Sequence, residues 1–345
     1  MGGIEMEMFR EGIISEPGKV VLRQREKRRP GAREALIRIK SSAVCGSDMH
    51  IFSGRHPYVS LPTTVGHEVA GIVEETGSEV TAVKVGDRVC VEPLITCGTC
   101  YYCRRGRYDY CENLKLKYRT GNSGYADYYY AEEQWIHRLP DEMSFDEGAL
   151  MEPFACTVHA AMKAKIHLCD SVCVMGDGPI GLMLAQLSLA CGATHVYVMG
   201  LQEDNLTLAK TFGCIPLVSG SEGIEEIMRR TEGRGVDVAF EAVGIPATFN
   251  QTMAVTKRGG RAIIFGIFED EFKTKALVDA MVREIEVVGT SSYCWDFQRG
   301  IDLVSAGKVD LKSLITHRFP LAEVQKAMDL KKGAGRQPLK IILEP

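Results

Sequence analysis

Three features are missing from this chain of 345 residues. No run of apolar residues reaches the roughly 18 that a membrane-spanning helix needs. The first residues, Met1 to Arg10, carry two glutamates and lack the apolar core of a secretion signal. The formal net charge is -4, which provides no attraction for nucleic acid, and the basic cluster Arg23 to Arg29 is typical of a solvated face. We therefore expect a cytoplasmic protein with no nucleic-acid or membrane partner.

Internal repeats and low-complexity segments are also missing, which favours ordinary globular domains. The length, with 45% hydrophobic and 25% charged residues, indicates about two domains with sizeable cores. The chain has 12 cysteines. Without a secretion signal, so many thiols favour reduced cysteines and metal binding over disulfide bonds.

A glycine-rich stretch in the middle of the chain predicts a nucleotide site. The apolar run Ser171 to Met175 is followed by Gly176, Gly178 and Gly181 in GxGxxG spacing and by a helical pattern over 180–190. Strand, tight turn and helix suit a dinucleotide pyrophosphate, because glycines let the backbone approach it and the helix N-terminus presents unpaired N–H groups. A simple structural turn is the alternative interpretation.

Strand and helix patterns alternate after this stretch, which predicts a doubly wound parallel sheet with ligands at the carboxyl ends of its strands. Before it, short alternating strands and frequent Gly and Pro predict a β-rich, barrel-like domain. We expect strands at 35–39, 69–74, 121–130, 194–199, 236–240, 261–265 and 339–343, and helices at 203–212, 295–306 and 321–330.

Two turns of the β-rich part carry residues that can bind metal. Cys45 lies in one turn, and His67 and Glu68 lie in the other. Thiolate, imidazole and carboxylate together are typical of zinc, and about three protein ligands would leave a position open for water or substrate. Each residue alone could be an ordinary core residue. Glu152, in an apolar run, is a further ligand candidate or an acid at a helix start.

A second group of cysteines follows a tighter pattern. Their CxxCxxCx7C spacing lets one short loop surround a tetrahedral ion with protein ligands only, so the site would be structural. Free cysteines and an iron–sulfur cluster are the alternatives. The four residues are Cys97, Cys100, Cys103 and Cys111.

Taken together and in this order, these motifs resemble those of the zinc-dependent medium-chain alcohol dehydrogenases, in the sorbitol (polyol) and threonine dehydrogenase branch. The resemblance covers the whole chain and includes Gly66-His-Glu-Val-Ala-Gly71 and Met151-Glu-Pro153. It implies a GroES-like catalytic domain at 1–150 and 293–345 and a Rossmann domain at 151–292. It also implies one catalytic and one structural Zn²⁺ per chain.

The resemblance assigns roles to individual residues. Cys45 and His67 would bind the catalytic zinc with Glu68 and Glu152, and which glutamate binds directly stays open. The zinc would lower the pKa of an alcohol oxygen while hydride passes to the nicotinamide. Asp48 would orient the ligand histidine, Ser47 would pass the substrate proton and His50 would relay it outward. The cofactor would contact Gly176, Gly178, Pro179, Ile180, Gly181, Gly200, Asn205, Val243 and Gly266.

The chain departs from the family pattern in the cofactor and substrate sites. Gly200 replaces the acid that normally binds the ribose hydroxyls of NAD, and Asn205 replaces an arginine common in the family. Glu203 and Asp204 would repel the 2′-phosphate of NADP, so the balance favours NAD, with NADP as the alternative. Ser291-Ser292-Tyr293 replaces the Phe-Arg-Tyr of sorbitol dehydrogenases, which removes an arginine that contacts polyols.

We therefore expect an oxidoreductase that interconverts a secondary alcohol and its ketone, with a polyol, cyclitol, aminocyclitol or sugar-alcohol phosphate as substrate. L-threonine 3-dehydrogenase is the alternative within enzymes, and a non-catalytic protein that binds nucleotide and zinc is the remote one. The resemblance also implies a homodimer or homotetramer, paired through an edge strand at 284–289.

Overall fold

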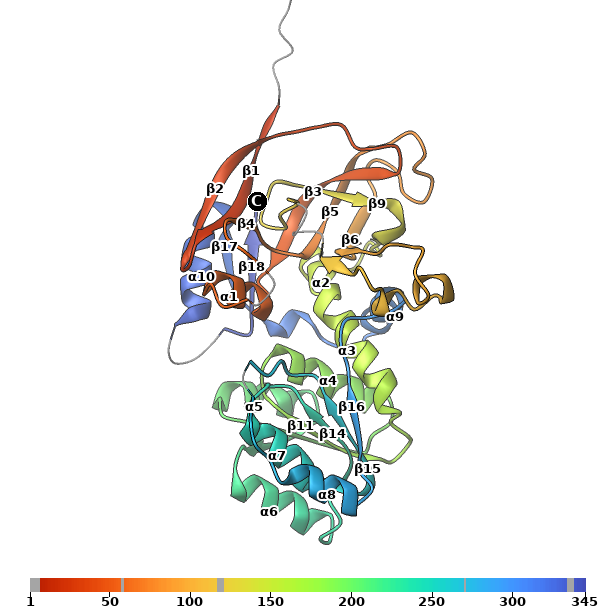
Figure 1. Ribbon diagram of the computed structural model, residues 1–345, viewed down its shortest axis with the longest axis vertical. Coiled ribbons are helices and arrows are strands. Elements are labelled where there is room, and N and C mark those ends of the chain that lie inside the picture. The colour runs from red at the N-terminus through yellow and green to blue at the C-terminus, as the bar shows by residue number, and fades with distance from the viewer. Residues whose placement is uncertain (1–6, 57–58, 117–120, 270, 334–337) are drawn as a thin grey trace, which may run out of the picture. The chain divides into compact units, whose positions relative to one another are not determined.

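The computed structural model describes residues 7–56, 59–116, 121–269, 271–333 and 338–345. These residues form two compact units (Figure 1). The first contains the chain up to Pro153 and again from Leu311, and the second runs from Phe154 to Asp310. Helix α3 (Met151–Ala164) contains the first division between them.

The first unit is built mostly on antiparallel strands, with one parallel pair, β17 and β18. Its largest sheet has the order β10-β6-β5-β3-β18-β17, with β9 also paired to β3, and a smaller sheet has the order β2-β1-β4. The strands are β1 (Met8–Glu16), β2 (Lys19–Glu26), β3 (Glu34–Ala43), β4 (Thr63–Thr64), β5 (Glu68–Thr76), β6 (Arg88–Val91), β9 (Tyr128–Glu132), β10 (Ile136–Arg138), β17 (Ile315–Pro320) and β18 (Lys340–Glu344).

Buried side chains on β3 and β5 supply much of the core of this unit. Leu36, Ile37 and Ile39 of β3 pack with Val69 and Val73 of β5 in one buried cluster. Leu36 and Ile37 are neighbours and both are 0% exposed, so β3 is covered on both faces here, since successive side chains of a strand point to opposite faces. The predicted β-rich domain is confirmed.

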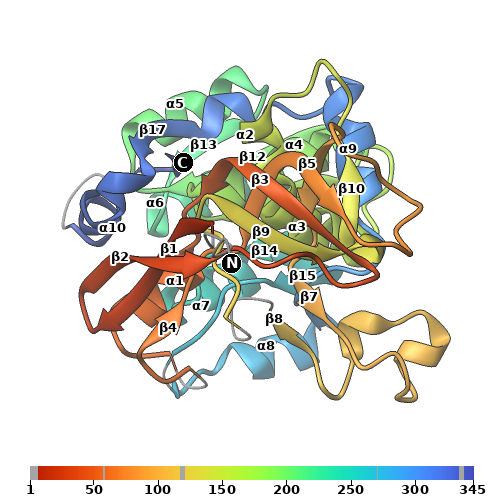
Figure 2. The ribbon, with the colours of Figure 1, turned by 90° about the horizontal axis from the view of Figure 1, so that it is seen from above.

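Short helices and a lobe complete the first unit. The lobe lies between β7 (Leu94–Ile95) and β8 (Lys115–Leu116), and Figure 2 shows it in orange to gold, projecting beyond these two strands. The remaining elements are α1 (Gly46–Phe52), α2 (Phe145–Ala149), α10 (Val324–Lys332) and the 3₁₀ turns η1 (Cys103–Arg105), η2 (Tyr108–Tyr110), η4 (Glu133–Trp135), η5 (Lys312–Leu314) and η6 (Leu321–Glu323).

The second unit is a six-stranded parallel sheet of order β13-β12-β11-β14-β15-β16. In chain order its strands are β11 (Ser171–Met175), β12 (His195–Gly200), β13 (Ile215–Val218), β14 (Val236–Glu241), β15 (Thr256–Ile264) and β16 (Glu286–Gly289). The order reverses between β11 and β14. Ligands bind at such a reversal, outside the carboxyl ends of the strands, so this sheet confirms the predicted Rossmann arrangement.

A helix follows each strand of this sheet, and all of these helices except the last one, α9, are crossover connections to the next strand. They are α4 (Pro179–Ala190), α5 (Glu203–Thr211), α6 (Ser221–Arg230), α7 (Pro246–Val255), α8 (Ala276–Val282) and α9 (Phe297–Ser305). Figure 1 shows α7 and α8 over one face, where Phe249 and Met253 pack with Ala262 of the sheet and Ala276 of α8. Strands covered on both faces are apolar throughout, as β11 is from Val172 to Met175.

The structure differs from the sequence expectations in two places. The strand expected at 121–130 begins only at Tyr128. Gly121 has a φ of +82°, and a Cβ on Gly124 would lie 2.6 Å from the backbone of Gly66, so this part of the chain turns closely against its neighbour instead of extending. The sequence analysis placed the second domain division after residue 292, which is before α9. The compact units of the structure divide after Asp310, so α9 belongs to the unit with the parallel sheet.

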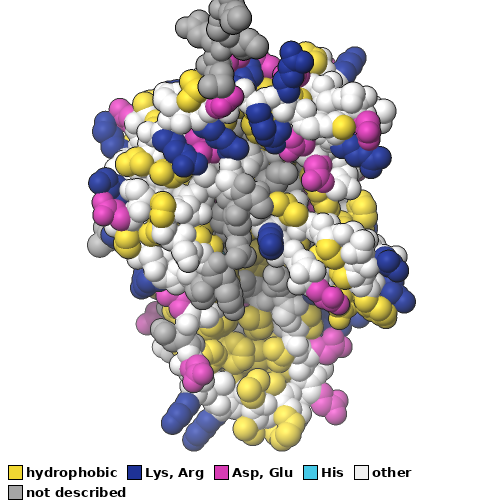
Figure 3. Space-filling view, turned by 45° about the horizontal axis from the view of Figure 1, so that its top comes forward, with side chains coloured by type: hydrophobic (Ala, Val, Ile, Leu, Met, Phe, Trp, Pro, Cys, Tyr) yellow, Lys and Arg dark blue, Asp and Glu magenta, His cyan; other side chains and the backbone are white. Residues whose placement is uncertain are grey.

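Charged side chains of both signs are interspersed on the face shown in Figure 3. Within the described residues, no helix is long and apolar enough to cross a membrane.

Candidate metal centres and nucleotide site

The pairing of β3 with β5 brings the first set of candidate ligands together. Ala43 at the end of β3 is paired with Glu68 at the start of β5. Cys45 follows β3 as the N-cap of α1, and His67 directly precedes β5. Because the two strands are antiparallel, the end of one and the start of the next lie at the same edge of the sheet.

The geometry at this edge suits a metal ion. One ligand atom each of Cys45, His67 and Glu68 lies within 4.8 Å of the others. His67 and Glu68 are buried, and Cys45 is half-buried. Glu152, at the start of α3, is also buried, and its Oε2 lies 4.0 Å from His67 Nε2. A thiol, an imidazole and a carboxylate at this spacing fit tetrahedral zinc with protein ligands and one open position.

Asp48 contacts the candidate ligand His67, and Tyr125 in turn contacts Asp48. Asp48 Oδ1 lies 3.4 Å from His67 Nδ1, and the Tyr125 hydroxyl donates a hydrogen bond of 2.6 Å to Asp48 Oδ2. Burial lowers the pKa of His67, but the charges of Asp48 and Cys45 outweigh this effect and raise the pKa well above its ordinary value. A carboxylate in this position fixes the ring and its tautomer. No sequence pattern indicated that Tyr125 would contact Asp48.

Lys340 engages one of the two glutamates. Its Nζ lies 2.5 Å and 2.7 Å from the two carboxylate oxygens of Glu68, and both residues are almost completely buried. Burial lowers the pKa of Lys340, but the charge of Glu68 outweighs it and raises the pKa. This ion pair occupies both oxygens of Glu68, whereas Glu152 Oε2 lies 4.0 Å from His67 Nε2. Both glutamates therefore remain candidates for the fourth ligand.

The proposed proton path lies on α1. Ser47 and His50 are three positions apart, so they share one face of the helix. Both residues are half-buried. This short helix thus has Cys45 at its N-cap and Asp48 in its first turn. It also carries both candidate relay groups, the Ser47 hydroxyl and the His50 imidazole.

The four cysteines of the lobe also meet. One sulfur each of Cys97, Cys100, Cys103 and Cys111 lies within 4.8 Å of the others, and all are reduced. Backbone N–H groups of Thr99 and Cys100 lower the pKa of Cys97 to about 6. Burial and the neighbouring thiols raise that of Cys103 to about 12. Four thiolates at this distance require a cation, so the donor set fits a structural zinc ion.

The glycine-rich turn has the form a pyrophosphate needs. Gly176 has a φ of +122°, and a Cβ on Gly181 would lie 1.9 Å from the carbonyl oxygen of Gly176, so the helix packs directly on the turn. A Cβ on Gly178, the N-cap of α4, would meet nothing within 4 Å. The turn therefore leaves open space at the N-terminus of a 12-residue helix that begins with Pro179 and Ile180.

The other candidate cofactor residues lie at neighbouring strand ends. Gly200 ends β12, Val243 follows β14 and is 44% exposed, and Gly266 follows β15. Asn205 is buried on α5. The buried carboxylate of Glu241 fixes this edge: its Oε1 accepts hydrogen bonds from the N–H groups of Val243 and Gly244 and from the Thr248 hydroxyl. Sequence patterns did not reveal this role, because Glu241 looked like an ordinary strand end.

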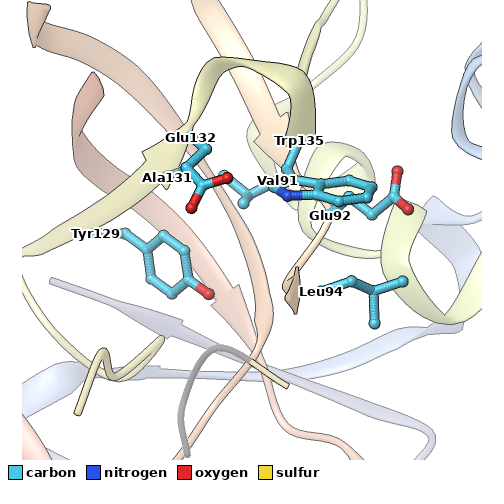
Figure 4. A pocket seen from close by; sticks show the side chains of 7 residues that line it. All are labelled: Val91, Glu92, Leu94, Tyr129, Ala131, Glu132 and Trp135. Carbon is cyan, nitrogen blue, oxygen red and sulfur yellow. The ribbon is translucent and has the colours of Figure 1, made fainter. Parts of the chain in front are cut away.

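A small hollow in the first unit contains none of the candidate ligands (Figure 4). In the part of the chain that the structure describes, the Tyr129 hydroxyl and Glu92 Oε1 are buried there without a hydrogen-bond partner. The other oxygen of Glu92 lies 3.1 Å from His137 Nε2. The hollow is lined by Val91, Glu92, Leu94, Tyr129, Ala131, Glu132 and Trp135.

Known families match both units. Residues 31–141 match the alcohol dehydrogenase GroES-like domain, and residues 179–306 match the zinc-binding dehydrogenase family.

Relatives agree with these matches over nearly the whole chain. Sorbitol dehydrogenase of Bacillus subtilis (strain 168) is 34% identical over 90% of each chain. D-arabitol-phosphate dehydrogenase of Enterococcus avium is 35% identical over 90% of each. A zinc-binding dehydrogenase from Sinorhizobium meliloti 1021, solved with NADP bound, superposes with a TM-score of 0.92 at 28% identity and covers 98% of this chain and 100% of that one.

Proposed function

The chain belongs to the zinc-binding alcohol dehydrogenases, and on that premise we propose that it interconverts a secondary alcohol and its ketone with NAD as hydride carrier. Its substrate is a polyol, cyclitol, aminocyclitol or sugar-alcohol phosphate. Relatives named for sorbitol and D-arabitol phosphate support this class. The exposed Ser291 and half-buried Ser292 in place of an arginine argue against sorbitol itself.

The meeting of Cys45 and His67 at one sheet edge, with Glu152 in reach, carries the proposal. Cys45 and His67 would hold the catalytic zinc together with Glu68 or Glu152, and the four cysteines of the lobe would hold a structural one. When bound, zinc supplies a Lewis acid for the alcohol or carbonyl oxygen, and the nicotinamide exchanges hydride with the carbon.

The chain's own groups would handle the proton and the orientation. The Ser47 hydroxyl would accept the proton of the substrate alcohol and pass it to His50, which carries it toward solvent. Asp48 would hold the His67 ring in its ligand orientation while it accepts the hydrogen bond of Tyr125. The open turn at Gly176 and Gly178 would bind the pyrophosphate of the cofactor.

A substrate panel tests this function directly. We would follow nicotinamide reduction by zinc-loaded protein with NAD and NADP in parallel, using sorbitol, xylitol, inositols, aminocyclitols, sugar-alcohol phosphates and L-threonine. Turnover on one of the first five classes is the expected result. A strict requirement for the amino and carboxylate groups of L-threonine would replace the polyol class, and binding of nucleotide without any turnover would favour the non-catalytic alternative.

Self-association through β16 is part of the proposal. This strand ends the parallel sheet, and Val287 on it is 41% exposed. The neighbouring helix α8 exposes Leu277, Val278, Met281 and Val282. An apolar sheet edge of this kind is a template for pairing with a second copy. We expect a dimer or tetramer by light scattering, and Val287→Lys should shift it toward the monomer.

A further inference from the structure

Asp177, the second residue of the glycine-rich turn, extends its side chain to a neighbouring strand. It lies between Gly176 and Gly178 at the end of β11, but its Oδ2 accepts hydrogen bonds from the N–H groups of Leu201 (2.9 Å) and Gln202 (2.7 Å). Those two groups directly follow β12. The carboxylate therefore lies at the carboxyl end of β12, although it belongs to the preceding turn.

Gly200 makes room for this carboxylate. A Cβ on Gly200 would lie 2.3 Å from Asp177 Cγ and 2.4 Å from its Cβ and Oδ2. The glycine is the last residue of β12, and its φ lies outside the left-handed region. The backbone thus does not require glycine at this position, whereas the Asp177 side chain does. The two residues are complementary in volume.

The end of the second strand is where dinucleotide-binding sheets usually place an acid for the ribose 2′-hydroxyl. Here a carboxylate is present at that position, supplied by residue 177 and not by residue 200. Asp177 Oδ1 has no hydrogen-bond donor among the described residues, so it can accept one from a ribose hydroxyl.

The charged residues that follow β12 most closely in the sequence are acidic. Glu203 and Asp204 are exposed at the start of α5, and no lysine or arginine occurs between Leu201 and Ala209. A 2′-phosphate carries a charge of about -1.5 to -2 at neutral pH. Close to Asp177 it would meet a carboxylate of like charge, whereas a 2′-hydroxyl would donate a hydrogen bond to that carboxylate.

We propose that Asp177 is the residue that selects NAD over NADP, replacing the acid missing from Gly200. This inference rests on the proposed dehydrogenase function and adds a specificity-determining residue to it. Because the selection acts on the ribose, it should appear in binding alone, without a substrate.

Calorimetry of the zinc-loaded protein tests the assignment with NAD⁺ and NADP⁺, and with 5′-AMP and 2′,5′-ADP as fragments. Wild-type protein should bind NAD⁺ at least about tenfold more tightly than NADP⁺. Asp177→Asn keeps an acceptor for the backbone N–H groups but removes the charge, and it should reduce this preference by about tenfold. Asp204→Asn removes the same charge from α5 and should change it less than about threefold.

A double variant tests the exchange of positions. Only glycine at 177 leaves room for a side chain at 200, so Asp177→Gly combined with Gly200→Asp should restore the preference that Asp177→Gly alone loses. Thermal unfolding of each variant checks that the fold is kept. An unchanged preference in a folded Asp177→Asn variant, or a wild-type preference for NADP⁺, would overturn the role of Asp177 and leave the dehydrogenase function intact. Wild-type protein that binds neither dinucleotide would refute both.

Discussion

The two candidate metal centres of the first unit are built in opposite ways. The lobe centre takes four thiols from one loop between β7 and β8. The mixed centre takes its candidate ligands from three separate places, at the end of β3, the start of β5 and the start of α3. One supporting residue, Lys340, comes from still further along the chain, 272 positions from Glu68.

This difference follows from the demands on each site. Four identical ligands that close around an ion need only a short loop. A site with an open position needs ligands held by rigid surroundings, because an unsupported ligand could move into the vacant position. The comparison predicts that the lobe contributes stability and that the mixed centre contributes activity.

Cys45→Ser should separate the two centres most sharply. Loss of the thiolate should remove metal from the mixed centre and reduce turnover by on the order of a thousandfold or more, because polarisation by a metal ion contributes several kcal/mol. Zinc analysis should show one ion fewer per chain, and NAD⁺ binding should persist. Turnover that survives in metal-analysed protein would contradict the assignment of Cys45.

Cys100→Ser should act mainly on stability. Without one of its four ligands the lobe should lose its zinc and several kcal/mol of local stability, because metal binding and folding are coupled in such loops. Limited proteolysis should then cut within 97–111 before any other region. Cys191→Ser is the matched control, since Cys191 is exposed and lies in neither cluster. Equal protease resistance of the two variants would show that the lobe does not depend on metal.

The sequence predicted the lobe centre more completely than the mixed centre. Spacing alone defined the lobe, because four ligands within one loop must lie close together. It could only suggest the mixed centre, since the register of Ala43 against Glu68 that joins Cys45 to His67 is a tertiary fact. The contrast also explains why Tyr125 and Lys340 were missed, because neither lies near the ligands in sequence.

The parallel sheet shows the same limit. Apolar runs and glycines predicted β11, β12 and β14 within a residue or two of their observed bounds. The route of the Asp177 side chain across to Gly200 depends on the pairing of two strands. Gly200 was therefore interpreted as a missing charge, although the structure places a carboxylate beside it.

Lys340→Met tests how much the free energy of unfolding depends on the buried ion pair between Lys340 and Glu68. Glu68 would lose its partner at 0% side-chain exposure, and breaking a buried ion pair in this way costs about 3–5 kcal/mol. Urea unfolding of zinc-loaded protein should show this loss. The double variant Glu68→Gln with Lys340→Met should recover most of it, because no charge is left unpaired. A single variant as stable as wild type would show that Glu68 has another partner, for which the bound zinc is the obvious candidate.

Tyr125→Phe should have the smallest effect on stability and turnover, and a closely matched control variant is available for it. It removes the 2.6 Å hydrogen bond to Asp48, and a bond to a charged acceptor contributes about 1.5–3 kcal/mol. We expect a loss of stability in that range and a modest decrease in kcat, because His67 would be held less firmly. Tyr129→Phe is the matched control: Tyr129 is equally buried, and its hydroxyl makes no hydrogen bond to Asp48, so this change should cost less. Equal losses in the two variants would mean that ring packing, and not the hydrogen bond to Asp48, gives Tyr125 its importance.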